Sequence, residues 1–131
     1  YYGCSAGTSN ATPIVAGVCG LMKSVRPSIT PAQAQEIIKK TADPINDAYL
    51  YPNGVGAGRI NAYCAVYHSE PLNLTGTLSG DYERYFTNLN NTIINSGTVN
   101  IRAAEVTIEG TFEVNTGVTL LMENTSSFSC P

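Results

Sequence analysis

The stretch GTSNATPIVAGVCGLM, residues 7–22, places a serine between a glycine-threonine turn and a long apolar run. Apolar residues recur through this run at helical spacing, which predicts a helix that is apolar around much of its circumference and is therefore buried. Gly17 and Gly20 would let a neighbouring element approach it closely. Pro13 is expected in the first turn, where a missing N–H costs little.

Ser9 is predicted to lie at or just before the N-terminus of this helix. Unpaired backbone N–H groups and the positive end of the helix dipole converge there, so an oxyanion would be stabilised. A nucleophilic serine in acyl transfer needs this environment, because one N–H aimed at the developing charge is worth on the order of 3 kcal/mol. The alternative is that Ser9 merely caps the helix, a common role for serine.

Two further helices are predicted before residue 70. In SITPAQAQEIIKKTADP, Thr30 is expected as N-cap, Pro31 at the first helical position and Gln33 closing a capping box. A loop rich in glycine and asparagine then leads to a short third helix with Asn61 as its cap. The expected inward face of the second helix consists of Ala34, Ile37, Ile38 and Thr41.

The segment GTSNATPIVAGVCGLM resembles the region around the catalytic serine of the subtilisin-like serine proteases, the subtilases, with the pattern Gly-Thr-Ser-x-Ala-Thr/Ser-Pro-x-Val-Ala-Gly. PSITPAQAQEIIKKTAD is similar to the family's next helix, and GVGAGRINAYCAV to the element that closes its catalytic domain. The resemblance runs from Gly7 to Val66. It departs from the pattern at Asn10, where methionine is usual, and at Ile14, where histidine is common.

This resemblance implies an α/β subtilisin-like catalytic domain of which the chain holds only the C-terminal helical part. It also implies a serine endopeptidase acting on polypeptides through an acyl-enzyme on Ser9. The Ser9 N–H would form part of the oxyanion hole, and the Thr8 hydroxyl would support it. By the same resemblance we expect a secreted, periplasmic or cell-surface protein. Structural calcium would be compatible with the family, but no ligand set is visible in the sequence, so the cofactor stays unknown.

The partners that would activate Ser9 are missing from the expected positions. A serine needs a general base and an orienting carboxylate, and in subtilases the chain order is Asp, His, Ser. The residues before Ser9 include neither Asp nor His, and the sole histidine, His68, is expected to be an ordinary surface residue. The opening YYGCS reads as the middle of a longer gene product. We therefore expect an upstream segment or companion chain to supply Asp and His, and this chain alone to be inactive.

Composition excludes several other classes of function. The formal net charge is −3, the sequence pI is about 4.9, and no cluster of Lys and Arg occurs, so neither nucleic acid nor an anionic membrane is an expected partner. No apolar run is long enough to span a bilayer. Four cysteines lack the paired spacing of a zinc or redox motif, and no metal site is expected. Cys19 and Cys64 are interpreted as small buried side chains, and a disulfide stays open; the other two are Cys4 and Cys130.

The chain changes character near residue 70, which predicts two domains, residues 1–70 and 71–131. The first carries five basic and four acidic residues, the second two basic and six acidic residues. The second part alternates apolar and polar residues in short runs, which predicts a small all-β accessory domain. The predicted strands are NLTGTL, YERYF, TIINSG, TVNIRA, EVTIEG, FEVNTG and VTLLME.

Two segments twenty residues apart, Asn95–Ile101 and Asn115–Leu121, look like copies of one unit and suggest a coiled or stacked β structure. The region also resembles short β repeats of secreted and surface proteins of Bacteroidetes-type bacteria, which implies a spacer or adhesion module. Tyr82, Tyr85 and Phe86 could form a binding patch, but aromatic residues in strands more often fill cores.

Two classes of function therefore remain open at this point. The first is the serine endopeptidase, and the second is a noncatalytic module in which the protease-like half is only a scaffold. A torn-off catalytic fragment should expose its apolar first helix. We expect a companion chain to cover that helix, or self-association through the face of Ile14, Val18 and Met22. The β half should fold without such help.

Overall fold

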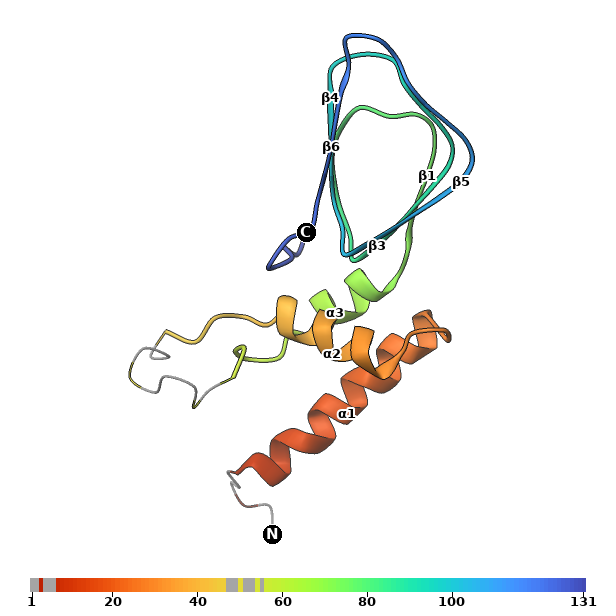
Figure 1. The fold of residues 1–131 in the computed structure, drawn as a ribbon. Helices are drawn as coiled ribbons and strands as arrows, with labels where there is room; N and C mark the ends of the chain where they lie inside the picture. Colours follow the sequence, from red (N-terminus) through yellow and green to blue (C-terminus); the bar gives the residue numbers. More distant parts are fainter. Residues whose placement is uncertain (1–2, 4–6, 47–49, 51–53, 55) are drawn as a thin grey trace.

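The computed structural model describes residues 3, 7–46, 50, 54 and 56–131. In this part of the chain three helices precede six strands, and the strands wind into a coil beside the helices (Figure 1). The helices are α1 (Thr8–Val25), α2 (Pro31–Lys40) and α3 (Ala62–Ser69). The strands are β1 (Leu72–Thr77), β2 (Gly80–Glu83), β3 (Phe86–Ile94), β4 (Thr98–Arg102), β5 (Glu105–Val114) and β6 (Thr119–Glu123).

Local side-chain chemistry starts α2 and α3 where the sequence predicts. The Thr30 hydroxyl accepts a hydrogen bond from the Gln33 N–H, and the Gln33 side chain accepts one from the Thr30 N–H. This is the predicted capping box, with Pro31 at the first helical position. The Asn61 side chain accepts a hydrogen bond from the Cys64 N–H and so caps α3. Both capping predictions are confirmed.

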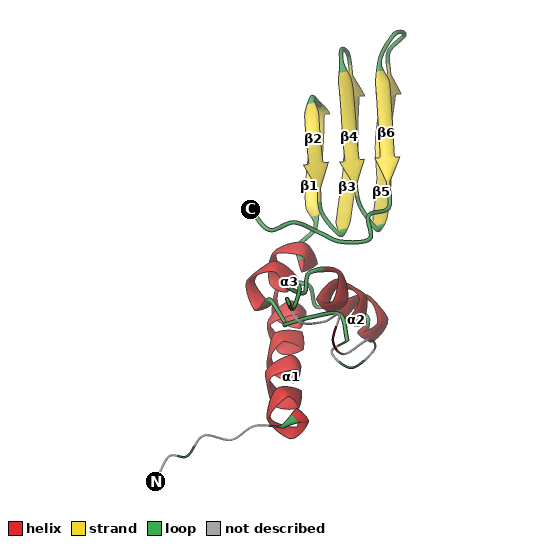
Figure 2. Ribbon diagram, turned by 90° about the vertical axis from the view of Figure 1, so that its left-hand side faces the viewer, coloured by secondary structure: helices red, strands yellow, loops and turns green. Residues whose placement is uncertain are grey.

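The strands form two three-stranded parallel sheets, in the orders β1-β3-β5 and β2-β4-β6. We call residues 72–123 the coil, because each turn of chain contributes one strand to each sheet and lies on the turn before it. Seen from the side in Figure 2, the strands of successive turns stand next to one another. The Asn115 side chain donates to the Asn95 side chain at 2.7 Å, 20 residues earlier. The stacked arrangement suggested by the two sequence copies is therefore confirmed.

Inward side chains of successive turns make ladders that fill the coil. Leu74 pairs with Leu89, and Leu89 pairs with Ile108. The buried members of this core are Leu74, Leu78, Leu89, Ile94, Val99, Ile101 and Ala103. The strand bounds differ from the prediction in three places. YERYF covers the end of β2, the corner at Arg84 and Tyr85 and the first residue of β3, and TIINSG covers only the end of β3 and the turn after it. The runs EVTIEG and FEVNTG belong to the single strand β5, which ends at Val114.

The helices and the coil share a second hydrophobic cluster at that corner. Phe86, 1% exposed, and Tyr85, 4% exposed, enter it from the coil, and Phe128 enters it from the C-terminal segment. The helices contribute Val18, Met22, Ile29, Ala34, Ile37 and Ala65. Tyr85 and Phe86 therefore fill a core rather than form a binding patch. Because this cluster needs both parts, the expected independence of the β half lacks support, and the two-domain division stays a prediction.

Polar contacts also cross from the helices to the coil. The Tyr85 hydroxyl donates to the Glu36 carboxylate at 2.6 Å, and the Arg26 guanidinium lies 3.3 Å from the centre of the Phe86 ring. The hydrogen bond from Tyr85, followed by that from Lys40, lowers the pKa of Glu36. These charged and aromatic groups thus hold the helices against the corner of the coil at Tyr85 and Phe86.

Helix α1 differs from the predicted helix in three respects. The helix was predicted to be buried, but only Val18 and Met22 are buried. A Cβ added at Gly17 or Gly20 would meet no described atom within 4 Å, so neither glycine serves a close approach. Pro13 lies inside the helix rather than in its first turn, because α1 already begins at Thr8. A single sequence reports which residues are apolar, whereas burial depends on which other segments lie against them.

Candidate active site

Ser9 lies in the first turn of α1, one residue after the helix begins. Thr8 and Ser9 are both exposed, and the N-cap residue Gly7 has no side chain to cap the helix. Gly7 has a φ of 149°, in the region that favours glycine. The positive end of the dipole of an 18-residue helix therefore lies beside an accessible hydroxyl.

Pro13 modifies the same turn from inside the helix. It has no N–H to donate to the carbonyl of Ser9 four residues earlier, and a proline ring crowds that carbonyl. The Thr12 hydroxyl instead donates to the Thr8 carbonyl at 3.0 Å, and the Asn10 N–H donates to the Gly7 carbonyl at 3.1 Å. The first turn is thus held partly by contacts outside the regular helical ladder.

Among the described residues, no general base contacts Ser9. The first turn of α1 lies at the end of that helix remote from α3 and the coil (Figure 2). His68 belongs to α3, and its Nε2 is hydrogen-bonded to the Ser129 carbonyl at 2.8 Å. The structure therefore does not bring the serine and the sole histidine of the chain together.

An apolar groove runs between α1 and α2. Its lining is mostly apolar and includes the side chains of Lys23 and Lys39. The other lining residues are Val15, Cys19, Gly20, Ile29, Thr30, Pro31, Ala34, Gln35 and Ile38. Outside the groove, α1 also exposes Ile14 by 58% and Leu21 by 54%. The self-association face proposed from the sequence is wrong in part, because Val18 and Met22 pack inside this chain.

A short antiparallel bridge joins the segment after α2 to the segment before α3. Asp43 and Arg59 exchange two backbone hydrogen bonds, and their side chains form an ion pair at 2.9 Å. Hydrogen bonds from Asn61 and then Arg59 lower the pKa of Asp43. Gly58 has a φ of 135°, and a Cβ there would lie 2.2 Å from the Asp43 carbonyl oxygen, so only glycine fits.

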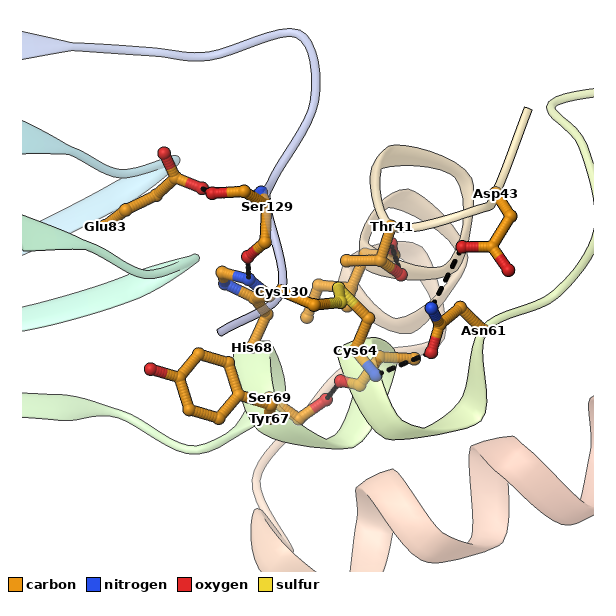
Figure 3. The surroundings of a disulfide bond; sticks show 12 residues. Thr41, Asp43, Asn61, Cys64, Tyr67, His68, Ser69, Glu83, Ser129 and Cys130 are labelled. Carbon is orange, nitrogen blue, oxygen red and sulfur yellow. Dashed lines mark hydrogen bonds between the residues drawn. A yellow bond between two sulfur atoms is a disulfide. The ribbon is translucent and has the colours of Figure 1, made fainter.

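The C-terminal segment, residues 124–131, is a strap that returns from the coil to the helices. Cys130 forms a disulfide with Cys64 of α3 (Figure 3). The Phe128 N–H donates to the Lys40 carbonyl at 3.0 Å. The sequence left disulfide pairing open, since four cysteines permit several pairings. Cys19 is free and half-buried, and Cys4 lies outside the described residues.

His68 lies under this strap and is fully buried, which overturns the expectation of a surface residue. Its ring lies 4.7 Å from the Phe128 ring, between centres, and 5.1 Å from the Tyr67 ring. Burial lowers the pKa of His68, because the imidazolium would lose its hydration. Its Nδ1 has no hydrogen-bond partner among the described groups. The sequence did not reveal this burial, because His68 lies near the end of α3 and two of its contacts, Phe128 and Ser129, come from the distant strap.

Glu83 connects the strap to the coil. Its carboxylate accepts hydrogen bonds from the Ser129 N–H at 2.6 Å and from the Ser129 hydroxyl at 2.7 Å. Burial opposes ionisation, but these bonds and the one from Arg102 outweigh it and lower the pKa of Glu83. The strap, α3 and β2 are thereby linked through one carboxylate and one disulfide.

The described residues contain no group of three metal-ligating side chains. The helices of that same part include none with the length and apolar character needed to cross a membrane. The arrangement therefore offers one exposed serine at a helix N-terminus, one apolar groove and one covalently closed strap.

Residues 1–58 match the subtilase family. The chain is 41% identical over 61 residues to the serine protease AprX of Bacillus subtilis, covering 47% of this chain and 13% of that protein. It is 51% identical over 55 residues to a thermostable alkaline protease of Halalkalibacterium halodurans, and the match covers 41% of this chain and 15% of that protein. An extracellular protease of Xanthomonas campestris is 46% identical over 61 residues, and the match covers 46% of this chain and 10% of that protein. No solved structure matches the chain.

The matched part corresponds to 10 to 15% of the length of these three relatives. The family match includes Thr8, Ser9 and the whole of α1 and α2, and it ends just before α3. The first part of the chain is therefore similar to the subtilase family and to proteins named as proteases.

Proposed function

We propose that this chain is the serine-bearing part of a serine endopeptidase, with Ser9 as the nucleophile that forms the acyl-enzyme. The observation that carries the proposal is the exposed position of Ser9 in the first turn of α1, inside the segment that matches the subtilase family. A helix N-terminus stabilises the negative charge that develops beside the attacking oxygen. The substrate is a polypeptide.

The N–H of Ser9 is one donor of the oxyanion hole in this proposal, and the Thr8 hydroxyl supports the hole. Both residues are exposed, so an acyl carbonyl can reach them. Pro13 contributes indirectly, because it leaves the Ser9 carbonyl without the usual helical donor and so loosens the turn that carries the nucleophile.

The general base and its carboxylate come from an upstream segment or a companion chain. His68 is an unsuitable base, since it is buried under the strap and its Nε2 is occupied by the Ser129 carbonyl. No acidic residue lies near Ser9 in the sequence before it. A serine without a base is a poor nucleophile, so this chain alone is inactive.

The missing part packs on α1, over the groove between α1 and α2 and over the exposed apolar side chains of α1 next to it. Ile14 and Leu21 of α1 are more than half exposed, and the space beside Gly17 and Gly20 is open. An apolar helix face of this kind needs a partner surface in a stable catalytic domain. The same packing would bring an upstream base toward the first turn of α1.

The compartment is extracytoplasmic in this proposal: secreted, periplasmic or on the cell surface. The Cys64–Cys130 disulfide supports it, because such bonds persist in oxidising compartments. One of the relatives is named an extracellular protease. The coil serves as an accessory spacer or adhesion module.

A fluorophosphonate serine probe and a casein substrate test the proposal in two preparations, this chain alone and the full-length gene product. We expect neither labelling nor cleavage with the chain alone, and both with the full-length protein. Ser9→Ala should abolish both in the full-length protein. Ser24→Ala, which alters an exposed serine at the other end of α1, is the matched control and should keep full activity.

Two results would contradict the proposal. Stoichiometric labelling of Ser9 in the isolated chain would show that no outside base is needed. Wild-type activity in full-length Ser9→Ala would place the nucleophile elsewhere. A full-length protein with no upstream Asp and His and no activity would favour the noncatalytic module.

A further inference from the structure

The last turn of the coil carries the same kind of inward side chain as the turn before it, but no further turn among the described residues lies on it. Leu89 in β3 is 1% exposed, whereas its ladder neighbour in β5, Ile108, is 47% exposed. Two other ladders repeat this difference: Ile94 at 0% against Val114 at 42%, and Ile101 at 0% against Met122 at 42%. The coil core thus ends in an open layer of apolar side chains.

The opposite end of the coil exposes less of its inward apolar side chains. The first turn is narrower than the later two in Figure 1, and its positions in register with Thr92 and Val99 are glycines, Gly76 and Gly80. Leu74 is only 8% exposed there. The two ends therefore differ, and only the β5–β6 end presents an unfinished layer.

The strap does not finish that layer. After β6 it runs beneath the coil toward the β1 side, as Figure 2 shows. Its described contacts are with α2, α3, Glu83 of β2 and the corner at Tyr85 and Phe86, all of them away from the outer side of β5 and β6. The apolar layer at the β5–β6 end therefore stays exposed in the described chain.

Backbone and charge at this end indicate what kind of partner fits. β5 and β6 are each paired on one side only, so their outer backbone groups face away from the sheet. The outward positions of β5 include Glu109 and Glu113, whose side-chain carboxylates have no hydrogen-bond or ion-pair partner among the described residues. A second copy docking end to end would place these carboxylates close to like charges, which is unfavourable.

We propose that the β5–β6 end is a docking surface for an extended segment of a partner protein in which apolar residues alternate with Lys or Arg. The partner strand adds to the edge of β5 through backbone hydrogen bonds, as in β-strand addition. Its apolar side chains continue the ladders above Ile108 and Val114, and its basic side chains lie opposite Glu109 and Glu113. The docked segment would act as the next turn of the coil.

Two synthetic ten-residue peptides test the proposal, one alternating Val with Lys and the other alternating Val with Glu. Fluorescence anisotropy with the complete 131-residue chain at low salt should show the Lys peptide binding about tenfold more tightly than the Glu peptide, since two cross-strand charge pairs change sign between them. Hydrogen exchange on the wild-type chain should show new protection in β5 when the Lys peptide is added. Protection confined to β1 and β2 would overturn the proposal.

A charge reversal supplies the second arm. Glu109→Lys with Glu113→Lys should reverse the preference and favour the Glu peptide. Glu70→Lys with Asp81→Lys makes the same change of charge at exposed positions away from this end, and should leave the tenfold preference intact. An equal loss in both double variants would mean that the peptides only sense net charge, and would overturn the proposal. Wild-type dimers in sedimentation that use the β5–β6 end would overturn it too.

Discussion

The helical region, residues 7–69, and the coil, residues 72–123, build their cores in different ways. In the coil each inward side chain lies on one from the turn before, so the same local pattern is used repeatedly. In the helical region the buried side chains come from separate helices and are completed by Tyr85, Phe86 and Phe128 from elsewhere. Repetition lets the coil fill its interior with its own side chains except at the β5–β6 end, whereas the helical region depends on distant segments and leaves one face of α1 uncovered.

Removing the disulfide should have the largest effect on this comparison, because it frees the strap from the helical region. Cys64→Ser with Cys130→Ser opens a covalent link over a sequence separation of 66 residues. Loop-closure entropy then predicts a loss of about 4 kcal/mol in the free energy of unfolding. Urea unfolding followed by circular dichroism measures it. Cys19→Ser, which changes a free cysteine, is the control. A comparable loss in the free energy of unfolding for that variant would show that the disulfide of the strap contributes nothing particular.

A pair of truncations within one ladder should sharpen the contrast between turns of the coil. Leu89→Ala should lower the free energy of unfolding by about 3 kcal/mol, because the side chain is 1% exposed and leaves a cavity. Ile108→Ala should cost about 1 kcal/mol, since half of that side chain already faces outward. Equal losses in urea unfolding would show that the last turn is covered in solution.

The capping box of α2 should make a smaller, purely local contribution. Thr30→Ala removes the hydroxyl that accepts from the Gln33 N–H, and should lower the free energy of unfolding by about 1 kcal/mol. Ser28→Ala, an exposed neighbour outside the helix, is the matched control and should change little. A loss as large as that of the disulfide variant would mean that α2 controls the whole helical region.

The smallest expected effect is a pH dependence located at His68. Burial lowers its pKa below the ordinary value of 6.5, so the unfolded chain binds a proton more readily than the folded chain. The contribution of His68 to the free energy of unfolding is therefore complete above about pH 6.5, and it is lost as the pH falls toward the pKa of His68 in the folded chain. Arg84 opposes protonation and Glu83 favours it, and both are weaker than burial.

Urea unfolding at pH 7 and pH 5.5 checks this dependence. His68→Gln should flatten the difference between the two pH values, and Tyr63→Phe on the exposed side of α3 should not. Glu36 and Glu83 have lowered pKa values, so their contributions to the free energy of unfolding are lost only at more acidic pH. If His68→Gln keeps the same difference in the free energy of unfolding between pH 7 and pH 5.5, another group causes the pH dependence.

Several elements of the fold were predictable because their causes are local. Thr30, Gln33 and Asn61 cap helices through groups within three residues, so the residue types alone reveal them. The twenty-residue spacing of Asn95 and Asn115 likewise predicts stacked turns. The candidate site was visible for the same reason, since the segment around Ser9 is continuous in the chain.

The missed features depend on long-range packing. His68 looks like a surface residue at a helix end, but the strap buries it from more than sixty residues away. The face of α1 that is buried also differs from the prediction, because an apolar helix offers several faces and α3 covers only the one with Val18 and Met22. The spacing of apolar residues in α1 does not show which of its apolar faces will be buried.

The sequence by itself determined the helix caps, the repeating strand pattern and the identity of Ser9 as the candidate nucleophile, because each depends on residues close together in the chain. Only the tertiary structure decided the pairing of Cys64 with Cys130, the burial of His68 and the open layer at Ile108. The physical reason is that a side chain's chemistry is fixed by its own atoms, whereas its burial and its partners are fixed by whichever distant segments fold against it.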